Sequence, residues 1–135
     1  MLFDFKFDWD DSLNVGIPEI DTQHQEFFRI GRSIEQLILT GCKNITEKEL
    51  LELLCEIRQY VTYHFYTEEE MLRERQEVLE KHKVKHEFLK KKINAVDCNK
   101  LVEEPVEALK ELKNVLQEWF FEHMLMEDIP TFRTK

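Results

Sequence analysis

Four stretches of the chain place apolar residues at alternating steps of three and four, which is the spacing of one face of an α-helix. The first stretch runs from about Asp21 to Thr40 and is followed by Gly41, a residue typical of the position just beyond a helix. The second stretch begins after a cap at Asn44 or Thr46. Both stretches therefore predict amphipathic helices with one buried face.

The other two stretches repeat this rhythm. The third covers Leu79 to Val96, and the fourth has Pro105 in its first turn, behind two glutamates that complement the positive end of a helix. Short connections favour antiparallel neighbours, so we predict an all-α fold, an up-down-up-down antiparallel four-helix bundle. The corner between the second and third helices is hardest to place, because residues 73–76 contain no turn residue.

The first eighteen residues have a different pattern. Aromatic residues alternate with acids from Phe3 to Trp9, and then Asn14, Gly16 and Pro18 interrupt any regular element. We expect an extended N-terminal arm whose aromatic side chains cover the helical body. The prediction is one domain over residues 1–135, with the arm at 1–18 and the four-helix bundle at 19–130.

Composition narrows the class of protein. A length of 135 residues suits a single domain, and the net charge of −9 argues against a nucleic-acid partner. No apolar run approaches membrane-spanning length, and the N-terminus lacks a basic start and a long apolar run, so we expect no membrane association and a cytoplasmic location. The three cysteines show no C-x-x-C spacing and predict reduced thiols. The charged exterior favours a monomer.

Polar residues interrupt the predicted buried faces. The positions concerned are His24, His64, Glu68, His82, His86 and His123. A single histidine on an apolar face is more often a hydrogen-bonded core residue than a ligand. Burying all of these groups without partners costs about 1–3 kcal/mol for each one. All five histidines of the chain fall on such positions, which favours neutral imidazoles arranged around a cation.

The spacing of these residues is compatible with one shared centre. His64 and Glu68 are four residues apart, as are His82 and His86, so each pair lies on one helix face. Five imidazoles and two carboxylates, the second from Asp128, are too many for one four-coordinate zinc. Two metal ions bridged by the carboxylates use every ligand, and we expect them in the middle of the bundle. Nitrogen and oxygen ligands without thiolate favour iron over copper or manganese.

The fourth helix poses a geometric difficulty. His123 and Asp128 are five residues apart, about 140° around an ideal α-helix. Both side chains face one point only if the helix loosens. Pro130 disfavours helical geometry at Ile129, so we expect the helix to stop or unwind near Asp128.

Ordered along the chain, these residues form a pattern that resembles the hemerythrins, most closely the single-domain bacterial hemerythrins. The pieces that carry the resemblance are Trp9, Val15-Gly16-Ile17, Asp21-x-Gln23-His24, His64-Phe65-x-x-Glu68-Glu69, His82-x-x-x-His86, and Trp119-x-x-x-His123-x-x-x-x-Asp128. The resemblance implies two non-haem iron ions joined by an oxo or hydroxo bridge. It assigns His82, His86 and His123 to a filled iron, His24 and His64 to an iron with an open position for dioxygen, and Glu68 and Asp128 to both.

The resemblance also directs attention to residues around the centre. Phe120 and Phe28 are the main candidates for a dry oxygen pocket, and Phe65, Trp119 and Trp9 are further ones, although each also fits an ordinary core. Asp21 either orients His24 or caps the first helix. Many relatives have a tyrosine-containing turn with glycine or proline at the corner where this chain has residues 73–78, so that corner is expected to differ.

The function implied is reversible dioxygen binding for carriage, storage or delivery. One alternative is oxygen or redox sensing, for which we expect a partner protein and not a built-in output domain. Another is a di-iron enzyme that acts on nitric oxide, peroxide or ferrous iron. The predicted ligands do not separate these three functions.

Overall fold

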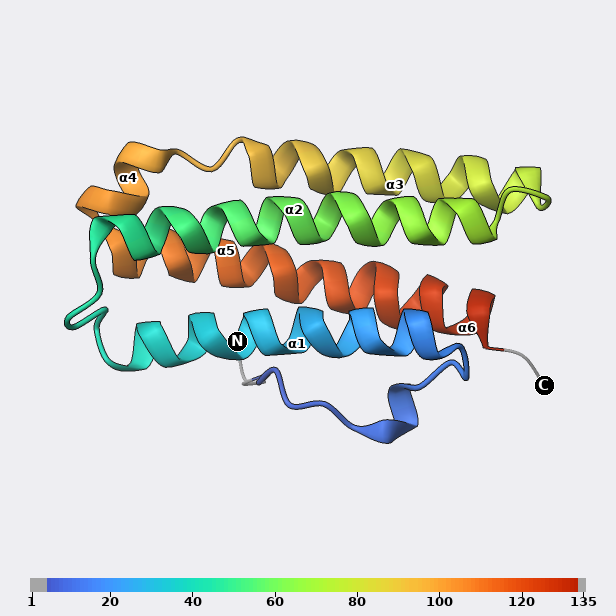
Figure 1. Cartoon of the computed structure of the whole chain (residues 1–135), viewed down its shortest axis with the longest axis horizontal. Helices are drawn as coiled ribbons and strands as arrows, with labels where there is room; N and C mark the ends of the chain where they lie inside the picture. The colour runs from blue at the N-terminus through green and yellow to red at the C-terminus, as the bar shows by residue number, and fades with distance from the viewer. Residues whose placement is uncertain (1–4, 134–135) are drawn as a thin grey trace.

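The computed structural model describes residues 5–133, and its helices form an antiparallel bundle in which successive long helices alternate in direction (Figure 1). The long helices are α1 (Pro18–Leu39), α2 (Glu47–Met71), α3 (Gln76–Asn94) and α5 (Pro105–Trp119). The last of them continues through a π-helical segment, η2 (Phe120–Asp128), into α6 (Ile129–Phe132). A short helix, α4 (Cys98–Glu103), and a 3₁₀ turn, η1 (Asp11–Leu13), lie in the connections. The all-α bundle predicted from the sequence is confirmed.

Local sequence explains both ends of α1. The helix begins at Pro18, three residues before the predicted start, because proline fits the first turn of a helix, where its missing N–H is not needed. At the other end Gly41 has a φ of 66°. Its N–H donates to the carbonyl of Ile38, and the N–H of Cys42 donates to that of Leu37. These two bonds form a Schellman motif, so Gly41 ends α1 as predicted.

The start of α2 is fixed by a reciprocal pair of side chains. The Thr46 hydroxyl accepts from the N–H of Glu49 at 3.1 Å, and the Glu49 carboxylate accepts from the N–H of Thr46 at 2.9 Å. This capping box satisfies two backbone donors that a helix start otherwise leaves free. Of the two predicted caps, Thr46 rather than Asn44 is therefore the one used.

Within the described residues, the N-terminal arm runs along α1 (Figure 1) and packs Phe5, Phe7 and Trp9 onto the bundle, as predicted, whereas Phe3 lies outside the described residues. Phe7 is fully buried, and its N–H donates to Glu35 on α1 at 2.9 Å. The Phe7 ring lies directly over Gly31, where a Cβ atom would approach the ring to 2.4 Å. Phe5 and Trp9 contact the ring of Phe28. The close approach of arm and helix thus depends on the glycine.

The α2–α3 corner turns without glycine or proline. Leu72 is buried there, its N–H donates to the Glu68 carbonyl, and its own carbonyl accepts from Arg75 at 2.8 Å. The Leu72 side chain belongs to a second apolar cluster whose other buried members are Val15, Ile20, Leu79, Ile129 and Phe132. Burial of one leucine therefore ends α2 where the local sequence carries no turn residue.

The fourth long helix, α5, has Pro105 in its first turn, as predicted. Ahead of it the chain forms a separate short helix, α4, which the sequence analysis did not predict and which the Asp97 carboxylate caps by accepting from the N–H of Asn99. Pro105 then begins α5, because a proline in mid-helix would remove a hydrogen bond. Within the described residues, every helix is too short or too polar to cross a membrane.

Candidate metal centre

Seven side chains from the four antiparallel helices meet in the interior. They are His24 on α1, His64 and Glu68 on α2, His82 and His86 on α3, and His123 and Asp128 on η2, and each is at most 2% exposed. The sequence placed this group in the middle of the bundle. It lies instead toward the end that holds the α2–α3 corner, because His24 is near the start of α1 and Glu68 is near the end of α2.

Glu68 divides its two carboxylate oxygens between two sets of histidines. Its Oε1 lies 3.1 Å from Nε2 of His86. Its Oε2 lies 3.0 Å from Nε2 of His64 and 3.5 Å from Nε2 of His24. One carboxylate thus faces imidazoles from three helices.

Asp128 divides its oxygens in the same way. Its Oδ1 lies 2.8 Å from Nε2 of His123 and 3.1 Å from Nε2 of His82, whereas its Oδ2 lies 3.8 Å from Nε2 of His24. The donor atoms therefore form two adjoining sets that share both carboxylates. His24, His64, Glu68 and Asp128 offer atoms within 4.8 Å of one another, as do Glu68, His86, His123 and Asp128.

The π-helical winding of η2 explains how Asp128 reaches this position. In a π-helix each N–H bonds to the carbonyl five residues earlier, so residues five apart return to about the same face. The N–H of Ile129 bonds to the carbonyl of Met124 in this way. The predicted loosening near Asp128 is present, but the predicted stop is wrong. Ile129 is helical and α6 continues to Phe132, because Pro130 occupies a first-turn position of α6 that needs no N–H.

Several buried atoms of the group lack a hydrogen bond even where another polar atom is near. They are Nε2 of His24, His64 and His123, Nδ1 of His24 and His123, Oε2 of Glu68, and Oδ2 of Asp128. Each such atom costs about 1–3 kcal/mol when nothing satisfies it. Most of these atoms face the shared interior and not a protein partner, which is the arrangement expected of donors for a cation.

The outer nitrogens of three histidines are held by acceptors. Nδ1 of His64 lies 2.6 Å from Oε1 of Gln23, and Nδ1 of His86 lies 2.8 Å from Oε2 of Glu69. Nδ1 of His82 lies 3.2 Å from the Val78 carbonyl. Because these oxygens only accept, each Nδ1 carries a proton. In a neutral ring the inward Nε2 then keeps its lone pair for a metal ion.

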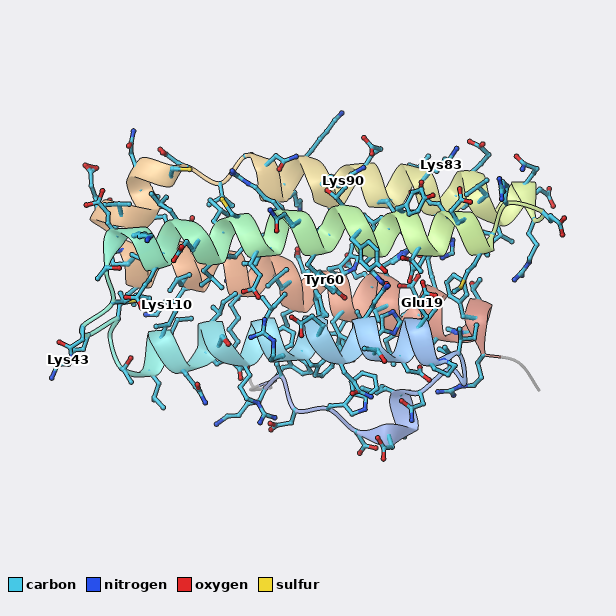
Figure 2. All side chains as sticks on the ribbon, viewed as in Figure 1. Glu19, Lys43, Tyr60, Lys83, Lys90 and Lys110 are labelled. Atoms are coloured by element: carbon cyan, nitrogen blue, oxygen red, sulfur yellow. The ribbon has the colours of Figure 1, made fainter. Side chains whose placement is uncertain are left out.

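Gln23 links two helices, a role that the sequence analysis missed. Its side-chain NH₂ donates to the Thr67 hydroxyl at 3.2 Å while its oxygen holds His64. Its backbone carbonyl accepts from the Tyr60 hydroxyl at 2.5 Å, and Tyr60 lies between α2 and α1 (Figure 2). Gln23 precedes Phe27 by four residues, so its buried position was detectable from the spacing.

Aromatic rings cover the imidazoles. Phe65 is stacked on His86 with centroids 3.8 Å apart, and Trp119 is stacked on His123 at 4.1 Å. Tyr60 is parallel to His64 at 5.5 Å. These contacts fix ring orientations and place apolar surface around the donors.

The other predicted neighbours take different places. Phe28 and Phe120 contact each other at 5.1 Å and pack against Phe5 of the arm, and both are buried. Their role in an oxygen pocket stays a prediction. Asp21 accepts from the N–H groups of Val15 and Gly16, so it holds the segment before α1, and it makes no hydrogen bond to His24.

Burial and neighbouring charges shift the pKa values of His64, Glu68 and His82. Burial disfavours a charged His64, but the Glu68 carboxylate outweighs burial and raises the pKa of His64 above its ordinary 6.5. Burial likewise opposes ionisation of Glu68, and the imidazoles nevertheless hold its pKa well below 4.5. Asp128 raises the pKa of His82 against the same opposing effect of burial. Protons therefore compete with any cation for these nitrogens.

Comparison with known proteins agrees with this donor set. The family model described as the hemerythrin HHE cation binding domain matches residues 15–130. A bacteriohemerythrin of Clostridium acetobutylicum is 24% identical over 123 residues, which cover 90% of this chain and 95% of that protein. A bacteriohemerythrin of Stenotrophomonas maltophilia is 29% identical over 123 residues, or 89% of this chain and 75% of that protein. No solved structure matches the chain significantly. The chain belongs to the hemerythrin family of cation-binding helical domains.

Proposed function

We propose that this protein binds dioxygen reversibly at a non-haem di-iron centre, for carriage, storage or delivery. The observation that carries the proposal is the division of Glu68 and Asp128, each of which turns one oxygen to each of two histidine sets. A single cation would be bound by one of the two histidine sets only. Two neighbouring cations, one in each set, would use both oxygens of both carboxylates. Membership of the hemerythrin family and the lack of thiolate among the donors favour iron.

The proposed ligands follow from the donor sets. His82, His86 and His123 would hold one iron, and His24 and His64 the other, with Glu68 and Asp128 bridging the pair beside an oxo or hydroxo group. The ion held by two histidines would have one donor fewer than the ion held by three. That ion would therefore have a free position for a small ligand. When bound, the iron pair supplies the electrons that reversible dioxygen binding requires.

The chain's own contribution is to orient the imidazoles and to exclude water. Gln23 and Glu69 hold the outer nitrogens of His64 and His86, so the inner nitrogens point to the centre. Phe65 and Trp119 cover the rings on the α3 and η2 side. A dry surrounding suppresses proton leakage to the bound ligand, which favours return of dioxygen over its reduction.

Metal analysis of ligand variants tests the site. We expect two iron ions per chain in the purified protein. His64→Ala should lose the iron with the open position first, and His82→Ala should disrupt the other. Gln25→Ala, an exposed position on α1, is the matched control and should keep both. If both histidine variants kept two irons, the ligand assignment would be wrong.

Spectroscopy separates the proposed function from its alternatives. Reduced protein should change its absorption in air and recover it when oxygen is removed. Iron that oxidises in air and does not recover would favour a sensor or an enzyme instead.

The same proposal includes a single domain over residues 1–135, a monomer and a cytoplasmic location. Free thiols at Cys42, Cys55 and Cys98 support a reducing compartment. Sedimentation of the purified protein tests the monomer, and a dimer at micromolar concentration would contradict it.

A further inference from the structure

An open groove runs between α3 and the α5–η2 helix, on the outside of the candidate metal centre. Its volume is about 670 Å³, within the range of small-molecule sites. The apolar side chains that line it are Val84, Phe88, Leu89, Val115 and Trp119. Val84 is 71% exposed and Phe88 is 61% exposed. The two side chains are neighbours on the surface of α3, because they lie four residues apart on one helix. Two large apolar groups side by side in solvent indicate a surface for an apolar ligand.

The net charge of α3 is positive, whereas the net charge of the whole chain is negative. This helix carries six lysines and three glutamates, while the chain as a whole has a net charge of −9. Four of the lysines, Lys83, Lys85, Lys91 and Lys92, line the groove, and Lys83 projects on the outside of the bundle (Figure 2).

Only part of that positive charge is neutralised by neighbours. Lys85 pairs with Glu127, and Lys92 lies 3.8 Å from Glu118 and over the ring of Phe88. Within residues 5–133, neither Lys83 nor Lys91 forms an ion pair. Three glutamates, Glu87, Glu118 and Glu122, also line the groove, so they favour a ligand with one negative charge over a polyanion.

One lining residue of the groove is a buried histidine with a ring nitrogen that makes no hydrogen bond in the described part of the chain. His123 is among its lining residues and is 1% exposed, and its Nδ1 makes no hydrogen bond. The nearest carboxylate oxygen, Oε1 of Glu127, is 3.9 Å away, beyond hydrogen-bond distance. Nε2 of the same ring faces Asp128, so Nδ1 is the nitrogen of His123 that has no nearby partner among the described residues.

We propose that this groove binds an amphipathic organic anion, with its apolar body on Val84, Phe88 and Trp119. A single carboxylate, sulfonate or phosphate would lie near Lys83 or Lys91. Within the described residues, an apolar floor, two lysines without ion pairs and a buried unpartnered histidine nitrogen line the same groove. Binding of such an anion goes beyond dioxygen binding, since Val84, Phe88 and the lysines do not belong to the metal centre, although the groove shares Trp119 and His123 with it.

The test uses the purified full chain and two matched probes. These are 8-anilinonaphthalene-1-sulfonate and its uncharged analogue N-phenyl-1-naphthylamine, followed by fluorescence and calorimetric titration. We expect one sulfonate site per chain. Val84→Asp should weaken binding of both probes at least tenfold. Lys83→Gln with Lys91→Gln should weaken the sulfonate severalfold and leave the uncharged probe unchanged.

Controls separate this site from general stickiness. Tyr66→Asp changes an aromatic residue on α2 that is 62% exposed, about as much as Phe88 in the groove. This variant should bind both probes as tightly as the parent. Unfolding midpoints of all variants should stay within a few degrees of the parent. The proposal fails if the sulfonate binds Val84→Asp as tightly as the parent, or if the lysine variants bind it unchanged. A parent dimer that Val84→Asp dissociates would assign the groove to a second copy and also overturn the proposal.

Discussion

At the scale of single residues, the candidate centre depends on side chains that are not themselves among its donors. Gln23 is the clearest example. Its side-chain oxygen accepts from His64, its side-chain NH₂ donates to Thr67, and its backbone carbonyl accepts from the Tyr60 hydroxyl. A histidine without such a partner can rotate or change tautomer, and its nitrogen then leaves the position that a metal ion needs.

Gln23→Ala should therefore weaken the hold on iron. We expect a loss of about 10–100-fold in iron affinity, the usual effect of removing a partner of a metal-ligating histidine. Chelator competition measures it, with Gln25→Ala as the control because Gln25 is exposed on the same helix. Equal iron retention in the two variants would show that Gln23 does not position His64.

Gly31 is the second residue whose identity matters. A Cβ atom there would lie 2.4 Å from the Phe7 ring, so Gly31→Ala must displace the arm. We expect a loss of about 1–3 kcal/mol in unfolding free energy, measured with urea. Combining it with Phe7→Ala should cost less than the sum of the single changes, because the clash is then gone. Simple additivity would contradict this account.

At the scale of elements, the candidate centre needs helices of two kinds. On α2 and α3 ordinary α-helical turns align pairs of residues four apart, whereas on η2 only the π-helical winding brings His123 and Asp128 together. The wider winding is a local departure from the preferred helix, and such segments often occur at functional sites.

The α2–α3 corner is the element whose stability depends most on one side chain. Leu72 is 1% exposed and packs with Val15, Ile20, Leu79, Ile129 and Phe132. Leu72→Ala should cost about 2–5 kcal/mol because it leaves a cavity. The exposed neighbour Arg73→Ala should change stability by less than about 0.5 kcal/mol. Urea unfolding compares the two, and equal costs would show that burial of Leu72 does not hold the corner.

The elements also show how far the sequence alone could reach. Apolar spacing, Gly41 and Thr46 are local features, and they predicted the helices and two of their ends. Spacing also selected the five histidines and Glu68, whereas Asp128 does not follow α-helical spacing from His123. The π-helical winding was not predictable, since the five-residue interval of His123 and Asp128 requires loosening without specifying its form. The roles of Gln23 and Glu69 depend on contacts between helices, which periodicity along one helix does not describe.

At the scale of the whole molecule, the charges of the centre and those of the surface act separately. The net charge of −9 lies mainly on exposed side chains. In the buried group, His64 lies 3.0 Å from Glu68 and His82 lies 3.1 Å from Asp128. Stability therefore depends on pH through the interior as well as the surface.

Chelator-stripped protein should show this dependence. The raised pKa of His64 and His82 gives stability that is fully present below 6.5 and is lost as the pH rises through their folded values. The lowered pKa of Glu68 gives stability that is present above 4.5 and is lost as the pH falls. Urea midpoints should thus be highest between these two values. A midpoint that rises steadily from pH 6 to 8 would contradict the coupling.

Reversible binding of dioxygen by two irons in this bundle can be measured directly. The most direct measurement is iron and dioxygen counted in the same sample of reduced protein, before and after evacuation. The account predicts two irons and one dioxygen per chain, with the dioxygen released and rebound over repeated cycles. Protein that carries no iron, or that consumes dioxygen without releasing it, would contradict the account.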